Sequence, residues 1–135
     1  MASFEYLQPK GDFTALMGEY SHGIKVPLPG ADLIFLTGQK AMDSNENVVA
    51  PGDPEKQTEY VFESIRKILA EAGATINDIV KAQIYVTDMN DFPVISKVRN
   101  RYFAKCKPVS TLVEVNCLSK KGCLVEIAVT AVKLK

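Results

Sequence analysis

The sequence predicts one α+β domain, with its elements in the order strand, strand, strand, helix, strand, helix, strand, strand. Two features predict this order. Short apolar runs bounded by proline and glycine lie toward both ends of the chain, which is typical of strands. Two longer segments between them carry apolar residues at helical spacing. The 135 residues suit a single domain over residues 1–135, and no internal repeat or linker divides it.

The first three strands are expected at residues 4–7, 20–26 and 32–39. The third is the clearest, because it contains a continuous apolar run at 33–36. A turn rich in proline and glycine at 27–30 separates the second strand from the third, so a hairpin is predicted there.

Asp53 and Pro54 mark the start of the first helix, with Asp at the N-cap and Pro at the first helical position. Gly73 marks its end. The apolar side chains between them form one stripe, so this helix is expected to cover one face of a sheet. The stripe consists of Val61, Phe62, Ile65, Ile68, Leu69 and Ala72.

A strand is expected at 79–88, followed by a second helix that residues 90–91 cap. This helix must end before the strand that begins at Pro108, because proline cannot continue it. The last two strands are predicted at 108–115 and 124–129, joined by a polar turn.

Two helices with one apolar stripe each can cover only one face of a mixed β-sheet of this size. Several strands are nonetheless apolar on both faces, for example 33–36 and 124–129. Strands of that kind are buried on both sides, and the chain has no further element to cover the second face. We therefore expect the sheet to pack against copies of itself. A sheet curled on itself is the alternative.

The 16 basic and 16 acidic residues give zero formal net charge. Nucleic-acid and membrane-surface proteins bind through a basic face, so neither class of partner is expected. Residues 1–10 contain no apolar signal segment, and no stretch is long enough to span a membrane. The three cysteines form no CxxC pair and His22 is the only histidine. We therefore expect reduced thiols, no metal site and a cytoplasmic location.

Glu126 lies inside the apolar run 124–129. A carboxyl group in such surroundings must be paired, hydrogen-bonded or protonated. With its pKa moved toward neutrality, it could activate water or relay a proton. On this residue alone, a structural glutamate paired with a lysine across the strands is favoured. Neither Glu114 on the preceding strand nor His22 forms a readable catalytic arrangement with other residues.

Several segments taken together resemble the Rid family, also called YjgF or endoribonuclease L-PSP proteins. The similarity extends from about Tyr20 to Leu134. The segments that carry it are Gly18-Glu19-Tyr20-Ser21, Leu36-Thr37-Gly38-Gln39, residues 71–81, residues 86–92, Val113-Glu114-Val115 and Val125-Glu126-Ile127.

The resemblance implies a chorismate-mutase-like fold and a homotrimer whose sheets form an inner, barrel-like core. It also implies three clefts between subunits, each lined by two chains and open to a small-molecule ligand. The positions that would bind a substrate are Tyr20, Gly38, Phe92, Ser96, Ser110 and Leu112, and the catalytic position is Glu126.

In the deaminase branch of this family, reactive enamines or imines derived from amino acids are hydrolysed to a keto acid and ammonia without a cofactor. Glu126 matches the glutamate credited with positioning water. The same branch has an arginine in a Pro-x-Arg pattern, where this chain reads Pro108-Val109-Ser110. Serine supplies neither a permanent charge nor a bidentate fork. Losing such a charge partner costs on the order of 2–5 kcal/mol of binding free energy.

The predicted function is therefore small-metabolite binding, with hydrolysis of an enamine or imine as the reaction. Lys107 could replace the missing charge, or the substrate could lack a carboxylate. One alternative is an endoribonuclease activity that inhibits translation, which the neutral net charge disfavours. Another is a non-catalytic ligand-binding or chaperone-like protein.

Overall fold

The computed structural model describes residues 3–135 of the chain. Seven strands and two α-helices follow one another in the predicted order, with one short extra strand after the third. The elements are β1 (Glu5–Leu7), β2 (Gly23–Leu28), β3 (Ala31–Leu36), β4 (Gln39–Lys40), α1 (Pro54–Glu71), β5 (Ile79–Val86), α2 (Phe92–Phe103), β6 (Val109–Glu114) and β7 (Val125–Leu134).

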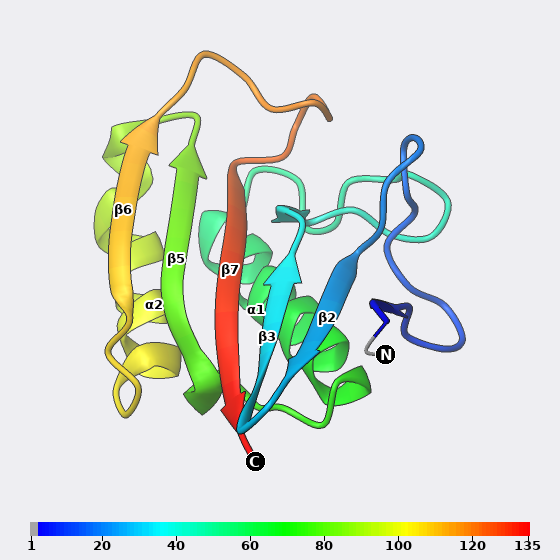
Figure 1. Cartoon of the computed structure of the whole chain (residues 1–135). Helices are drawn as coiled ribbons and strands as arrows, with labels where there is room; N and C mark the ends of the chain where they lie inside the picture. The colour runs from blue at the N-terminus through cyan, green and yellow to red at the C-terminus, as the bar shows by residue number, and fades with distance from the viewer. Residues whose placement is uncertain (1–2) are drawn as a thin grey trace.

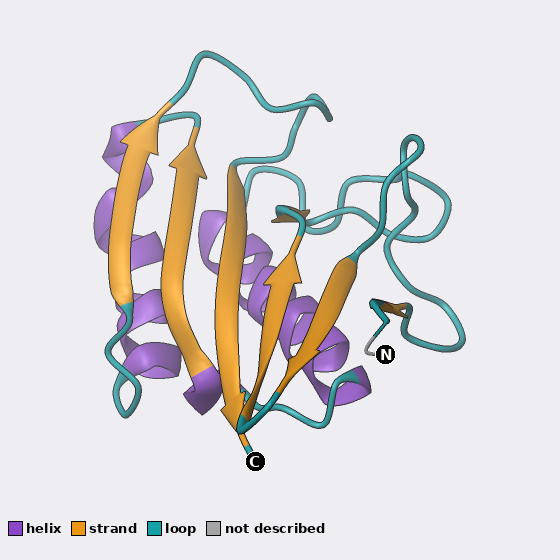
Figure 2. Cartoon of the chain, in the orientation of Figure 1, coloured by secondary structure: helices purple, strands orange, loops and turns teal. Residues whose placement is uncertain are grey.

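All seven strands belong to one mixed sheet, with the spatial order β1-β2-β3-β7-β5-β6 and with β4 also paired to β7. The β5–β6 pair is parallel and the other pairs are antiparallel. Both α-helices lie behind the sheet in Figures 1 and 2, so they cover one face and leave the other open. This two-layer arrangement is the predicted one. Within residues 3–135, no helix is long and apolar enough to cross a membrane.

The caps of the two helices agree only partly with the predicted ones. At α1, the Asp53 carboxylate accepts a hydrogen bond of 3.0 Å from the Lys56 backbone N–H, as expected for an N-cap. At α2, Asp91 occupies the N-cap position as predicted, but its side chain makes no capping hydrogen bond. Asp88 instead accepts from the Asn90 N–H at 2.9 Å, which caps the short 3-10 turn that precedes α2.

The hydrophobic core lies between the helices and the sheet. In β7, alternate residues Val125, Ile127, Val129 and Ala131 are at most 3% exposed and face this core. The apolar stripe predicted for α1 is buried in the same layer. The domain therefore closes its core with one face of the sheet only.

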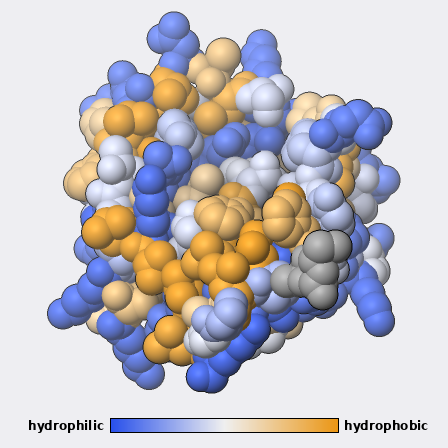
Figure 3. All heavy atoms as spheres, viewed as in Figure 1, coloured by the Kyte–Doolittle hydropathy of each residue, from blue (hydrophilic) through white to orange (hydrophobic). Residues whose placement is uncertain are grey.

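The open face of the sheet carries the second set of apolar side chains. Figure 3 shows hydrophobic groups gathered across the lower half of this face, over the strands. Phe35 is 46% exposed and Val109 is 69% exposed. Sheet curling within the chain does not bury these side chains, so the alternative of a sheet closed on itself is wrong for the single chain.

The predicted strand 32–39 is interrupted at its end. β3 stops at Leu36, and β4 resumes at Gln39 beside a different part of β7. At the break, the Thr37 backbone N–H donates to the His22 carbonyl at 2.9 Å. The break turns the chain so that Lys40 lies directly across from Glu126.

Candidate active site

An open pocket of about 630 Å³ lies at the end of the open face, where β4, β5 and β7 meet two loops. Its walls combine two charged groups with hydroxyl, thiol and apolar side chains. The lining residues are Met17, Tyr20, Thr37, Gly38, Lys40, Tyr85, Val115, Cys117, Leu118, Ser119 and Glu126.

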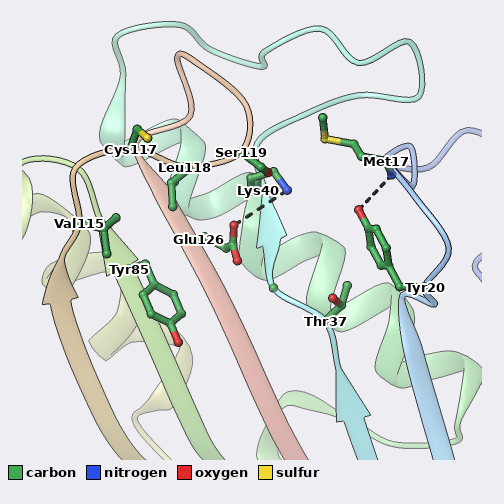
Figure 4. A pocket seen from close by; sticks show the side chains of 11 residues that line it. Met17, Tyr20, Thr37, Lys40, Tyr85, Val115, Cys117, Leu118, Ser119 and Glu126 are labelled. Atoms are coloured by element: carbon green, nitrogen blue, oxygen red, sulfur yellow. Dashed lines mark hydrogen bonds and ion pairs between the residues drawn. The ribbon is translucent and has the colours of Figure 1, made fainter.

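Glu126 and Lys40 supply the two charges of this pocket. They are direct partners in the antiparallel β4–β7 pairing, so their side chains leave the sheet on the same face. The Lys40 ammonium lies 3.9 Å from a Glu126 carboxylate oxygen, as the dashed line in Figure 4 marks. The Glu126 side chain is 26% exposed and the Lys40 side chain only 9%. The predicted cross-strand lysine partner is therefore present, and it lies in a pocket.

Gly38 makes room for the Glu126 carboxyl group. A Cβ atom added at Gly38 would lie 2.7 Å from Cδ and 2.8 Å from Cγ of Glu126. Contacts that short do not occur between non-bonded carbon atoms, so any side chain at Gly38 would displace Glu126. The break between β3 and β4 thus places a glycine where the carboxylate needs space.

Tyr20 forms the opposite wall of the pocket and is 44% exposed. Its hydroxyl oxygen accepts a hydrogen bond of 3.0 Å from the Met17 backbone N–H. Because that bond uses an oxygen lone pair, the hydroxyl proton stays free to donate to a ligand.

His22 lies beside Gln39, the first residue of β4, and is 2% exposed. Its Nε2 donates to the Thr14 carbonyl at 2.9 Å, and its Nδ1 lies 3.4 Å from the Gln39 side-chain nitrogen. Burial lowers the pKa of His22 below its ordinary value, and the nearby Lys40 charge lowers it further, although the hydrogen bond to Thr14 opposes both. We therefore describe His22 as a neutral, structural imidazole that holds Gln39 and the start of β4.

The structure does not bring the other predicted site residues into this pocket. Ser110 and Lys107 line a separate pocket of about 390 Å³ together with Arg99. Ser96 lies on α2, where its hydroxyl oxygen accepts from the Arg99 guanidinium at 2.9 Å. Phe92 precedes it on the same helix, under the same guanidinium at 5.9 Å.

The strand register explains this separation. Ser110 pairs with Ala82, and Leu112 pairs with Ile84. The side chains of Ala82 and Ile84 face the helices and are at most 1% exposed, so Ser110 and Leu112 point to the same side of the sheet. Glu126 pairs with Tyr85 on the opposite face. Within one chain, Ser110 and Leu112 therefore cannot meet Glu126. Their predicted role in one cleft needs a second chain and stays a prediction.

Sequence reasoning missed Lys40 as a pocket residue. A usable signal was available, because a lysine directly after Gly38-Gln39 interrupts the end of an apolar strand. Cys117, an exposed free thiol, and Ser119 were also missed, because both lie in a loop that no periodicity places. Among residues 3–135, no cluster of three or more metal-ligating side chains is found.

Comparisons with known proteins place the chain among related sequences and structures. A family model described as Endoribonuclease L-PSP matches residues 13–133. A RutC family protein of Pyrococcus abyssi is 40% identical over 117 residues, which cover 87% of this chain and 88% of that protein. The 3-aminoacrylate deaminase RutC of Acinetobacter baylyi is 36% identical over 107 residues, which cover 78% and 84%.

A solved structure gives the same result for the fold. The crystal structure of E. coli TdcF with bound serine has a TM-score of 0.79 against this chain at 27% identity, and the match covers 96% of this chain and 98% of that one. The predicted fold is thus confirmed for the single chain.

Proposed function

Because this chain belongs to the endoribonuclease L-PSP family, also called the Rid or YjgF family, we propose that it hydrolyses small reactive enamines or imines to keto compounds and ammonia. The observation that carries the proposal is the pair of opposite charges, Glu126 and Lys40, in a small pocket that is open to solvent. The similarity to a 3-aminoacrylate deaminase and to a protein with bound serine supports a substrate of amino-acid size.

The proposed reaction is addition of water to a C=N bond, with the enamine first taking a proton on carbon to become the imine. Glu126 accepts a proton from water while the water oxygen forms a bond to the imine carbon. The nitrogen receives that proton, which gives the neutral carbinolamine. Glu126 then takes the hydroxyl proton of the carbinolamine and delivers it to the same nitrogen, so the C–N bond breaks and ammonia leaves as the C=O bond forms. One placed carboxylate is sufficient for these transfers, because the same group first takes and then returns a proton.

We further propose that the complete site forms between copies of the chain. Ser110 and Leu112 lie on the opposite face of the sheet from Glu126, so only a neighbouring chain can bring equivalent residues to the pocket. A trimer that packs the open faces together would also bury Phe35 and other exposed apolar side chains. The three free thiols are consistent with a reducing, cytoplasmic location.

The test is hydrolysis of freshly generated 2-aminoacrylate and 2-iminobutanoate, measured as ammonia release above the uncatalysed rate. We expect the wild type to be active and Glu126→Gln to lose activity by at least about 100-fold, because general acid–base catalysis contributes this much. Lys97→Met, which changes an exposed side chain on α2, is the matched control. Equal rates for the wild type and Glu126→Gln would reject the proposal.

The same preparation separates the other two candidate functions. Ser110→Arg restores the arginine of the deaminase branch; if only this variant hydrolyses the imines, the natural substrate is a different one. An RNA-directed enzyme would bind RNA with an affinity that falls steeply with salt. A protein that only binds its ligand would function equally well as the wild type and as Glu126→Gln.

A further inference from the structure

We infer that Lys40 binds the carboxylate of the substrate, so that the chain recognises an anionic ligand without the arginine it lacks at position 110. The inference rests on the proposed function and names the substrate class of the same pocket. It assigns the recognition charge to β4 of the subunit that supplies Glu126, not to a residue from β6.

The geometry of Lys40 leaves its ammonium group available to a ligand. The ammonium nitrogen lies 3.9 Å from the nearest Glu126 oxygen, which is beyond the range of a hydrogen bond. The three N–H donors of Lys40 are therefore not taken up by Glu126. The side chain is only 9% exposed, yet it lines the pocket wall. A cation held this far from water gains most from a second, closer anion, because an incompletely paired buried charge is costly.

The other cations near the predicted cleft are less suitable within the chain. Lys107 is exposed and lies in the pocket beside Ser110, on the helix-covered side of the sheet. The Arg99 guanidinium in that pocket already donates to Ser96 and Asn100. Lys40 is the one Lys or Arg among the described residues that line the pocket of Glu126.

The arrangement also defines the kind of ligand. A small acid whose carboxylate contacts Lys40 would place its neighbouring carbon atoms beside Glu126, since the two groups are only 3.9 Å apart. A lysine is a point charge on a flexible stem, whereas arginine imposes a planar, bidentate geometry. We therefore expect the pocket to accept acids that carry the nitrogen on either the second or the third carbon, provided that the carboxylate is present.

The test is a binding titration that does not depend on turnover. The probes are 2-oxobutanoate and its neutral amide, and the readout is the dissociation constant from NMR shifts of wild type, Lys40→Met and Lys40→Arg. We expect Lys40→Met to weaken binding of the acid by about 10- to 100-fold, the range for losing one charged hydrogen bond. Binding of the amide should change less than about twofold by the same reasoning, and Lys40→Arg should retain most of the affinity for the acid.

Three results would overturn the inference. The first is equal affinity of the wild type for the acid and the amide, which includes the case in which neither binds. The second is unchanged binding of the acid by Lys40→Met. The third is loss of acid binding in Lys107→Met instead of Lys40→Met. Lys97→Met is the control for removing a lysine charge elsewhere. Urea unfolding of each variant verifies that it is folded.

Kinetics separate ligand binding from mere positioning of Glu126. If Lys40 binds the carboxylate, Lys40→Met raises KM for an anionic imine and leaves a neutral imine amide unaffected. If Lys40 only orients Glu126, kcat falls equally for both substrates, and the inference is wrong. Lys40-dependent binding of the acid by a wild type that hydrolyses nothing would reject the proposed function and leave this inference standing.

Discussion

Gly38 determines where the carboxylate of Glu126 can lie. The two residues approach so closely that the Glu126 carboxyl group occupies the space that a side chain at position 38 would need. The resemblance to the Rid family pointed to both positions, but only the break between β3 and β4 explains why a glycine is needed there.

Replacing this glycine should damage catalysis more than folding. In Gly38→Ala, the new methyl group would push the Glu126 carboxyl group aside by about an ångström, and a displacement of that size can cost on the order of 100-fold in rate. Ammonia release from 2-iminobutanoate measures the effect, and urea unfolding measures stability in parallel. An alanine variant with wild-type turnover would show that the position of the carboxylate is not critical.

His22 should make the stability of the protein depend on pH. Its pKa is lowered in the folded protein, so the unfolded chain binds a proton more readily as the pH falls below about 6.5. The free energy of unfolding should therefore decrease as the pH falls through that value, and this contribution should level off below the folded pKa. Urea titrations at several pH values, compared between wild type and His22→Gln, isolate the effect. Parallel curves for the two proteins would contradict it.

At the scale of elements, α1 holds the loop that forms part of the pocket wall. Gln57 is fully buried, and its side-chain nitrogen donates to the Gly122 carbonyl at 3.1 Å. Its side-chain oxygen accepts from the Leu124 backbone N–H at 2.8 Å. The helix thus fixes the end of the segment that also carries Cys117 and Ser119.

Removing this connection should destabilise the fold. Gln57→Ala would remove the partner of the Gly122 carbonyl and of the Leu124 N–H and leave a void at a fully buried position, with an expected cost of about 2–3 kcal/mol. Lys56→Ala, at the exposed neighbouring position, should change the free energy of unfolding by less than about 0.5 kcal/mol. Chemical denaturation of both variants tests the comparison, and equal effects would exclude the proposed anchoring role.

The elements differ in how well the sequence predicted them. The start of α1 was predictable because Asp53 and Pro54 are strong local signals. The side-chain capping bond ahead of α2 was not, because Asp88 and Asp91 are both chemically suitable and only the fold selects Asp88. The pairing of Lys40 with Glu126 depends on the register between strands far apart in sequence, which local patterns do not contain.

At the scale of the whole molecule, the uncovered face of the sheet is the main evidence for assembly. The apolar pattern on both sides of the strands predicted a buried second face, and the single chain leaves that face open. The trimer stays a prediction, and so does the joint cleft that would unite Ser110 with Glu126.

A charge on this face should prevent assembly. We expect the wild type to have three times the 14.8 kDa mass of one chain in solution, and Phe35→Lys to shift toward the single-chain mass, because an unpaired charge is costly to bury. Glu71→Lys, at an exposed position of α1, is the control. Light scattering gives both masses, and a wild type that remains a single chain at high concentration would refute the prediction.

The two-residue strand β4 has a consequence for such a separated subunit. Lys40 and Glu126 are aligned by main-chain pairing inside one polypeptide, so their spacing does not depend on contact with other subunits. As the protein is diluted and its subunits separate, we expect the catalytic rate per subunit to fall first, whereas each separated subunit keeps its affinity for small acids.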